Sequence, residues 1–182
     1  MLVPRDTLVT LTPDGDLVPD GRPGTARVWP FTQSRRFVRR SRNPRWLDPI
    51  NLMVLRTTPA AIIDLLASMG WLRPGDGATH RTWIDGGFRR MNDHTALGSR
   101  AERVHIRVFQ FGEHTLIGAH HEVADGEGPH RVTSWDHARE VTSAALEAAG
   151  ATRLTSTGII TPPNLRGVPG DGRVERLLGP GG

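Results

Sequence analysis

The stretch "RVHIRVFQFGEHTLIGAHHEV", residues 103–123, consists of two strand-like runs separated by a glycine. Residues 103–111 and 115–123 are rich in β-branched and apolar side chains, which is typical of strands. The dipeptide Gly112-Glu113 between them fits a two-residue type II′ turn, which takes glycine at its first position. This stretch therefore predicts a β-hairpin.

The turn also fixes which side chains face one another, because successive residues of a strand point to opposite faces of the sheet. One face of the predicted hairpin is apolar and belongs to the core: Val108 opposite Ile117, Ile106 opposite Ala119 and Val104 opposite His121. The other face is mostly polar and charged: Phe109 opposite Leu116, Arg107 opposite Gly118, His105 opposite His120 and Arg103 opposite Glu122.

The surrounding sequence predicts a strand and a helix before the hairpin and a helix and a strand after it. The apolar run 49–56 is of strand length, and Thr58-Pro59 supplies an N-cap and a first-turn proline for a helix that ends near Gly70. A second helix is predicted over 134–149 with Ser134 as its N-cap, and a last strand over 152–160. Residues 73–100 are interpreted as loop, apart from a short strand at 81–84.

This element order predicts an α+β fold of the βαββαβ (split βαβ) type, with an antiparallel or mixed sheet. Both helices are expected on one face of the sheet, which leaves the other face open. An N-terminal β-hairpin is predicted around Asp14-Gly15. The chain is divided into a hairpin and Arg-rich arm (1–46), the α+β domain (47–160) and a loosely ordered Gly/Pro-rich tail (161–182).

The basic charge of the chain is concentrated in one segment. All 23 basic residues are arginine, and the net charge is only +4 despite a sequence pI near 11.2. Residues 35–45 hold six of them and no acid, so the rest of the chain carries 17 arginines against 19 acidic residues. The arginine-rich composition of this arm predicts that it contacts the phosphates of nucleic acid or of an anionic membrane surface. The arginines of the arm are Arg35, Arg36, Arg39, Arg40, Arg42 and Arg45.

Several classes of chemistry are excluded by composition. The chain has no cysteine, which rules out disulfides, thiolate catalysis and cysteine zinc sites. It contains no apolar run of the roughly 20 residues that span a bilayer and no secretory signal pattern, so a cytoplasmic location is expected. No P-loop, GxSxG or GxGxxG motif occurs.

The polar face of the hairpin is the candidate site. Facing Cβ atoms lie about 4.5–5.5 Å apart, so His105 and His120 could share a metal ion, or one ring could orient the other. Glu122 is the third metal-ligand candidate. A cross-strand histidine pair beside the Arg103–Glu122 pair is also a common feature of a solvated sheet face, and this structural alternative stays open.

Five segments together resemble the LssY C-terminal domain family, which is named after a protein of a bacterial type I secretion locus. The similarity covers residues 46–150 and rests on "DPINLMVL" (48–55), "MGW" (69–71), "VHIRVF" (104–109), "LIGAHHE" (116–122) and "HRVTSWDHAREV" (130–141). The sequence differs from the family pattern at His120-His121-Glu122, where the family more often has small or hydroxyl residues before an Asp. The resemblance implies no assigned reaction, and it implies a neighbouring membrane protein as one type of partner.

Three hypotheses follow. In the leading one, the open face binds an anionic small molecule or a protein partner. Arg103, His105, Arg107 and His130 contact the anion, Glu122 and Asp136 orient them, and the ligand-binding set also includes His120. In the second, the protein is a metal-assisted hydrolase of a phosphoester; a divalent ion is held by His105, His120 and Glu122, and the candidate catalytic residues are His105, His130 and Asp136. In the third, the Arg-rich arm binds nucleic acid or a membrane surface.

Overall fold

The computed structural model describes residues 49–74, 89–124, 130–154, 168 and 170–181, together with the backbone of short strand segments at 9–11, 17–19, 26–28, 33–34, 80–84 and 87–88. The Arg-rich arm at 35–45 lies outside these residues, so its predicted phosphate contacts stay a prediction. Most of the predicted last strand (155–160) and the first part of the predicted tail (161–167) also lie outside them.

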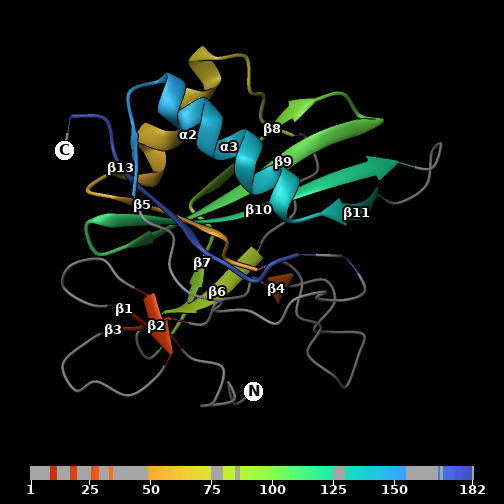
Figure 1. Cartoon of the computed structure of the whole chain (residues 1–182). Coiled ribbons are helices and arrows are strands. Elements are labelled where there is room, and N and C mark those ends of the chain that lie inside the picture. The colour runs from red at the N-terminus through yellow and green to blue at the C-terminus, as the bar shows by residue number, and fades with distance from the viewer. Residues whose placement is uncertain are drawn as a thin grey trace, which may run out of the picture.

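A mixed seven-stranded sheet with two helices on one face forms the main body (Figure 1). Its strand order is β12-β13-β5-β10-β9-β8, and β11 pairs with the far end of β10. The strands are β5 (Leu52–Leu55), β8 (Asp93–Gly98), β9 (Glu102–Phe111), β10 (His114–Ala124), β11 (His130–Ser134), β12 (Thr152–Arg153) and β13 (Glu175–Leu178). The predicted α+β class with a mixed sheet and two helices is confirmed.

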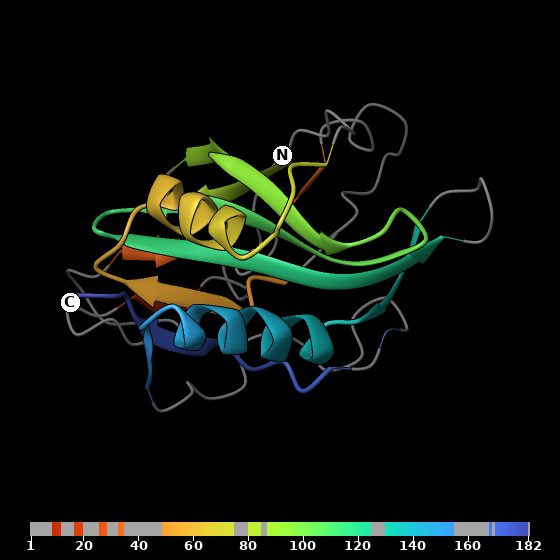
Figure 2. The same cartoon turned by 90° about the horizontal axis from the view of Figure 1, so that it is seen from above.

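The two helices lie side by side on that face (Figure 2). Helix α2 (Pro59–Ser68) packs on β8 and β9, and helix α3 (Asp136–Ala148) packs on β10, β9 and β13. Thr58 caps α2 as predicted, since its Oγ1 accepts a hydrogen bond from the N–H of Ala61 at 3.2 Å. The N-cap of α3 is Trp135 and not Ser134 as predicted, although Ser134 Oγ still accepts the N–H of His137 at 3.1 Å.

The shared core lies between the helices and the sheet. It is made of buried apolar residues from four strands, both helices and two connecting segments: Leu52, Val54, Ile62, Ile63, Leu66, Trp71, Val104, Ile106, Val108, Ile117, Ala119, Ala138, Leu146, Ala151 and Leu177. A second apolar cluster lies on the opposite face of the sheet and includes Met53, Phe109 and Leu116, all fully buried. Both faces of the central strands are thus packed.

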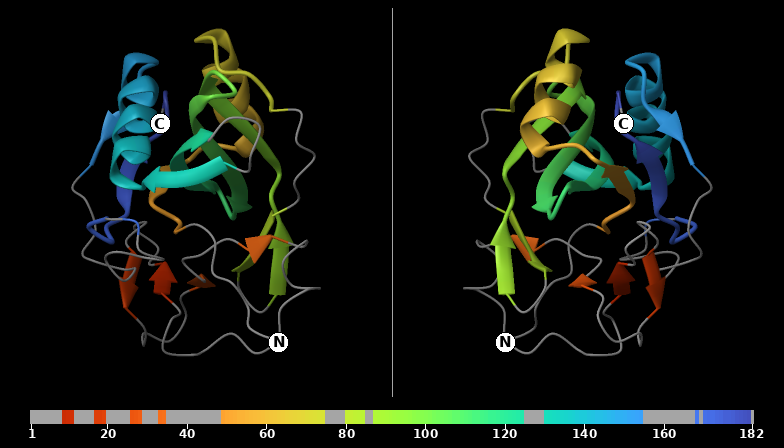
Figure 3. Two further views of the ribbon diagram at one scale, coloured as in Figure 1. Left: turned by 90° about the vertical axis from the view of Figure 1, so that its right-hand side faces the viewer. Right: turned by 90° about the vertical axis from the view of Figure 1, so that its left-hand side faces the viewer.

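A second sheet lies on the side of the main sheet away from the helices (Figure 3). Its order is β2-β1-β3-β6-β4, with β7 beside β6, and β6 contacts β9. Its strands are β1 (Val9–Leu11), β2 (Leu17–Pro19), β3 (Ala26–Val28), β4 (Gln33–Ser34), β6 (His80–Ile84) and β7 (Gly87–Arg90). Strands β1 and β2 pair antiparallel, and the predicted turn at Asp14-Gly15 lies outside the described residues.

The predicted hairpin register is confirmed. Phe111 pairs with His114, His105 with His120 and Arg103 with Glu122. Gly112 has φ 55°, a backbone angle that glycine adopts without the steric cost of a Cβ atom, as the first position of a type II′ turn requires. The turn residue therefore sets which side chains of β9 and β10 share a face.

Two parts of the sequence interpretation are wrong. Residues 87–90 and 93–98, interpreted as loop, form β7 and β8. Residues 175–178, assigned to a loosely ordered tail, form β13, which pairs in parallel with β5 and separates β5 from β12. Leu177 is fully buried in the core, and Asp171 accepts two hydrogen bonds from the guanidinium of Arg139 at 2.6 and 2.8 Å. Packing thus overrides the Gly/Pro-rich composition of the segment.

Asn51 joins β5, β10 and the start of α3 through its side chain. Its Oδ1 accepts the N–H of Ala119 at 2.9 Å, and its Nδ2 donates to the carbonyls of Ala119 at 2.9 Å and Trp135 at 3.3 Å. These groups are buried, so removal of the amide would leave the N–H and C=O of Ala119 without these partners, whereas the carbonyl of Trp135 would keep its bond from the N–H of Arg139.

We expect Asn51→Ala to lower the free energy of unfolding by about 3 kcal/mol, because buried N–H and C=O groups would be left unsatisfied. Urea unfolding followed by circular dichroism measures this loss. Asn92→Ala is the matched control: Asn92 is exposed and its Oδ1 accepts one hydrogen bond, from Gln110 N. Equal losses in the two variants would contradict the role given to Asn51.

Truncation of Leu177 to Ala tests the place of β13 in the core. We expect a loss of about 2–5 kcal/mol, the range typical of removing a buried leucine side chain. The exposed Leu72, with 69% of its surface accessible, is the matched control, and its truncation should cost less than about 0.5 kcal/mol. If the segment of β13 lay outside the core, both substitutions would lower the free energy of unfolding only slightly.

Candidate functional site

The predicted polar face is buried rather than open to solvent. His105 and His120 are each 1% exposed, Glu122 is 6% exposed and Arg107 is 7% exposed. The expectation of an open face is therefore wrong, and the second sheet lies on this side of the molecule (Figure 3). Burial of charged groups is costly unless they are paired, so their partners decide what the site can do.

Three of these side chains and Arg103 form a continuous chain of hydrogen bonds. Arg107 Nη1 lies 3.0 Å from His120 Nδ1, and because a guanidinium can only donate, Nδ1 accepts. His120 Nε2 therefore carries the proton and donates to Glu122 Oε2 at 2.9 Å. Arg103 Nε donates to the other carboxylate oxygen, Oε1, at 2.5 Å. The carboxylate of Glu122 is thus held from both sides.

These contacts keep Glu122 ionised. Burial by itself raises the pKa of a carboxyl group, but the hydrogen bonds and charges of His120 and Arg103 outweigh burial and lower the pKa of Glu122 from 4.5 to about 2. The site therefore contains a fixed negative charge throughout the physiological pH range.

His105 differs from its neighbours because one of its ring nitrogens lacks a hydrogen-bond partner. Its Nε2 lies 3.0 Å from His94 Nδ1, whereas its buried Nδ1 has no hydrogen bond within the described part of the chain. Glu122 Oε1 lies 3.8 Å from this Nδ1, too far for a hydrogen bond. Burial first, and then the charges of Arg107, His120, Arg103 and His94, lower the pKa of His105 well below its usual value, so the ring is neutral.

Three potential metal-ligand atoms converge at this point. Ligand atoms of His105, His120 and Glu122 all lie within 4.8 Å of one another, and they are the three residues that the sequence predicted as metal ligands. Zinc binds imidazole nitrogen and carboxylate oxygen at about 2.0–2.2 Å, so ligands around one ion lie about 3.4 Å apart. Small side-chain movements would bring these atoms to that spacing.

His94 belongs to this group and was missed by the sequence analysis, which placed it in a loop. Strand β8 pairs with β9 so that His94 lies opposite Arg107, and the ring of His94 reaches His105. The only sequence signal was the short "DHTALG" run of β8. Its pairing with β9 is what brings the ring to the site.

Two other predicted site residues make their contacts elsewhere. His130 pairs with Ala124 at the start of β11, and its Nε2 donates to the carbonyl of Arg100 at 2.8 Å. Asp136 lies in the first turn of α3 and accepts the backbone N–H of Asp171 at 3.1 Å. Neither shares a described contact with His105, His120 or Glu122, so the structure gives no support to their proposed role as general base.

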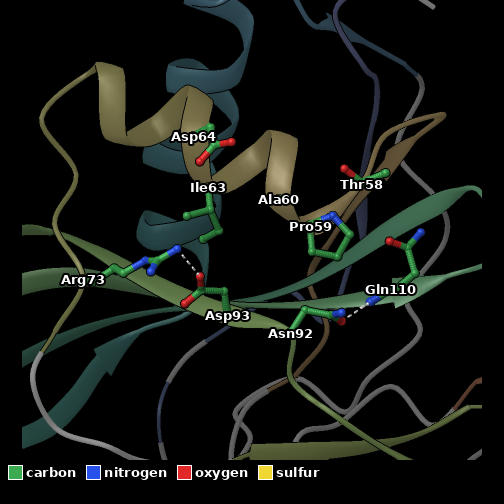
Figure 4. Close-up of a pocket in the computed structure, with 9 residues that line it drawn as sticks. All are labelled: Thr58, Pro59, Ala60, Ile63, Asp64, Arg73, Asn92, Asp93 and Gln110. Carbon is green, nitrogen blue, oxygen red and sulfur yellow. Dashed lines mark hydrogen bonds and ion pairs between the residues drawn. The ribbon is translucent and has the colours of Figure 1, made fainter.

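A separate pocket of about 300 Å³ lies at the start of α2 (Figure 4). It is lined by Thr58, Pro59, Ala60, Ile63, Asp64, Arg73, Asn92, Asp93 and Gln110. Arg73 Nη2 is paired with Asp93 Oδ2 at 2.7 Å, and Asn92 Oδ1 accepts the N–H of Gln110 at 2.7 Å. These polar groups of the lining are paired with each other, so the pocket offers fewer hydrogen-bonding groups to a ligand than the buried histidine group does.

Comparisons of the chain with protein-family models, with curated proteins and with solved structures find no match. The resemblance to the LssY C-terminal domain family therefore stays a prediction. Among the residues that the structure describes, no helix is long and apolar enough to cross a membrane.

The low pKa of Glu122 predicts a pH-dependent stability of the metal-free protein. Because the folded-state pKa lies below the unfolded value, this stabilisation is fully present above about pH 4.5 and is lost as the pH falls toward 2. The shift corresponds to about 3 kcal/mol. We expect the free energy of unfolding of Glu122→Gln to lack this component.

Urea unfolding at pH 5, 4, 3 and 2, with a chelator present, measures the difference between the two proteins. Glu113→Gln in the exposed hairpin turn is the matched control and should leave the pH profile unchanged. Parallel profiles for the wild type and Glu122→Gln would show that the carboxylate is not held as described.

Proposed function

We propose that the protein binds a divalent transition-metal ion, with zinc the best match, through His105 Nδ1, His120 Nε2 and Glu122. Binding requires the ring proton of His120 to move from Nε2 to Nδ1, so the ion replaces the Nε2 contact with Glu122 and the Arg107 contact at Nδ1 must open. The observation that carries the proposal is the buried Nδ1 of His105, which has no hydrogen bond among the described residues and points toward a carboxylate oxygen 3.8 Å away. A buried polar atom without a partner is costly, and a metal ion would satisfy it.

The chemistry of the donors supports this assignment. Zinc binds neutral imidazole and carboxylate, and the low pKa of His105 together with that of Glu122 supplies one of each in the form that binds metal. His105 Nε2 would donate its proton to His94 Nδ1, 3.0 Å away. Such a contact fixes the tautomer that leaves Nδ1 free for the ion.

Burial favours binding of the ion over turnover of a substrate. The three side chains provide three of the four ligands that zinc takes, and a catalytic ion must offer its remaining position to the substrate. A phosphoester would have to reach that position past ligands that are 1%, 1% and 6% exposed. The ion would instead cross-link β9 and β10 and stabilise the fold. A structural ion is therefore better supported than the catalytic ion of the hydrolase hypothesis.

We expect the chelator-treated full chain to bind one zinc ion in isothermal titration calorimetry. Replacement of His105 by Ala, or of Glu122 by Gln, should weaken binding at least about 100-fold, because each removes a ligand. His94→Ala removes only a partner of a ligand and should cost about 10- to 100-fold. His114→Ala, a half-buried histidine that accepts the N–H of Arg56, is the matched control.

Thermal unfolding gives a second readout of the same site. Zinc at 100 times its dissociation constant should stabilise the wild type by about 2.7 kcal/mol, as mass action requires for a ligand that binds only the folded state. His114→Ala should respond like the wild type. If His105→Ala bound zinc as tightly as His114→Ala, the ion would lie elsewhere.

A second candidate function is binding of a small anion at the same place. Arg103 and Arg107 both contact the group. Guanidinium groups form charge-assisted hydrogen bonds with phosphate and carboxylate, and an anionic ligand is the leading hypothesis from the sequence for this face. Inorganic phosphate is the probe: phosphate binding that survives a chelator and is lost in Arg107→Gln would favour the anion over the metal ion.

A further inference from the structure

A second polar cluster lies on the other face of β10, near the first turn of α3. It contains Thr133 of β11, His121 of β10 and Glu102 of β9, which come from three neighbouring strands. His137 of α3 packs edge-on against the ring of His121, with ring centroids 4.9 Å apart. The cluster is separate from the buried histidine group, because His120 and His121 point to opposite faces of the strand.

The three side chains are joined by two hydrogen bonds of defined direction. His121 Nε2 lies 3.1 Å from Glu102 Oε1, and a carboxylate can only accept, so Nε2 carries the ring proton. His121 Nδ1 therefore accepts in the neutral ring, and Thr133 Oγ1 lies 2.6 Å from it. The threonine hydroxyl donates to an imidazole whose other nitrogen is oriented by a carboxylate.

The hydroxyl of Thr133 has a different partner from the hydroxyls of the buried threonines that the structure describes. Thr95, Thr115 and Thr142 donate to backbone carbonyls, at 3.1, 3.0 and 2.7 Å, as buried threonines commonly do. Thr133 also has a carbonyl in reach, that of His121 at 3.3 Å, but the imidazole contact is 0.7 Å shorter.

A β-bulge produces the arrangement. Ser134 pairs with His121 and Val132 pairs with Glu122, so Thr133 is an extra residue between two consecutive residues of β10. Bulges redirect a side chain out of the regular alternation and are over-represented next to active sites. Thr133 and His121 are half-buried, and Glu102 has 67% of its side chain exposed, so the hydroxyl lies near the surface.

We propose that Thr133 is a nucleophile for acyl transfer from small esters, with His121 as its general base and Glu102 as the positioning residue. A nucleophile hydrogen-bonded to a base that is oriented by a third group is the geometry such catalysis requires.

The reaction has two balanced steps. The Thr133 oxygen forms a bond to the acyl carbon, its proton passes to His121 Nδ1, and the bond to the leaving oxygen breaks as that oxygen takes the proton. In the second step, a water oxygen bonds to the acyl carbon and gives a proton to Nδ1. The bond between the acyl carbon and Thr133 then breaks, and the threonine oxygen recovers the proton.

The test uses the full chain in a chelator, so that the metal site does not contribute. An alkyl fluorophosphonate captures an activated hydroxyl by forming a P–O bond and releasing fluoride, and peptide mass spectrometry locates the adduct. We expect one adduct, on Thr133, that is absent in Thr133→Ala, retained in Thr133→Ser and formed at least about 100-fold more slowly in His121→Gln. Thr152→Ala, at an exposed position of β12, is the matched control and should label like the wild type.

Turnover of p-nitrophenyl acetate tests the positioning residue. Glu102→Gln should lower kcat about tenfold and leave KM unchanged, and Glu102→Asp should restore part of kcat. The absence of an adduct, an adduct on another residue, or labelling of His121→Gln at the wild-type rate would overturn the proposal. Thr133→Ser guards against loss of folding, since it keeps the hydroxyl and removes only a methyl group.

Discussion

The turn at Gly112-Glu113 is the constraint on which the rest of the molecule depends. It sets the register of β9 against β10, and a shift of one residue would exchange the apolar and polar faces of one strand. The correct register directs Ile106 and Ala119 toward the helices and directs His105 and His120 to the opposite face. Core formation and assembly of the polar group are therefore consequences of the same turn.

Burial gives the polar group its chemical character. A histidine pair on a solvated sheet face would exchange its hydrogen bonds with water, but these two rings are 1% exposed and must find partners within the protein. His120 and Glu122 find them in Arg107 and Arg103. The incomplete pairing of His105 is what distinguishes this cluster from an ordinary structural network and points to a bound ion.

Local patterns were sufficient to predict the hairpin, the helix start at Thr58 and the grouping of three ligand candidates, and they placed the second helix start one residue early, at Ser134 instead of Trp135. Each depends on residues that are near in sequence or are related by one turn. The missing parts depend on long-range pairing: β13 joins β5 across more than 100 residues, and β8 contributes His94 only by pairing with β9. Short strands in Gly-rich sequence carry too little periodicity to predict this, and burial of the polar face depends on packing that no local pattern encodes.

A single spectrum can test whether His105 Nδ1 and His120 Nε2 bind the same ion. Nitrogen-15 NMR of the histidine rings reports the protonation and ligation state of each ring nitrogen before and after zinc is added to the metal-free protein. We predict that one equivalent of zinc moves these two nitrogens to metal-bound shifts and leaves the rings of His114 and His130 unchanged. Unaltered signals from His105 and His120, with or without changes at other histidines, would contradict the central claim.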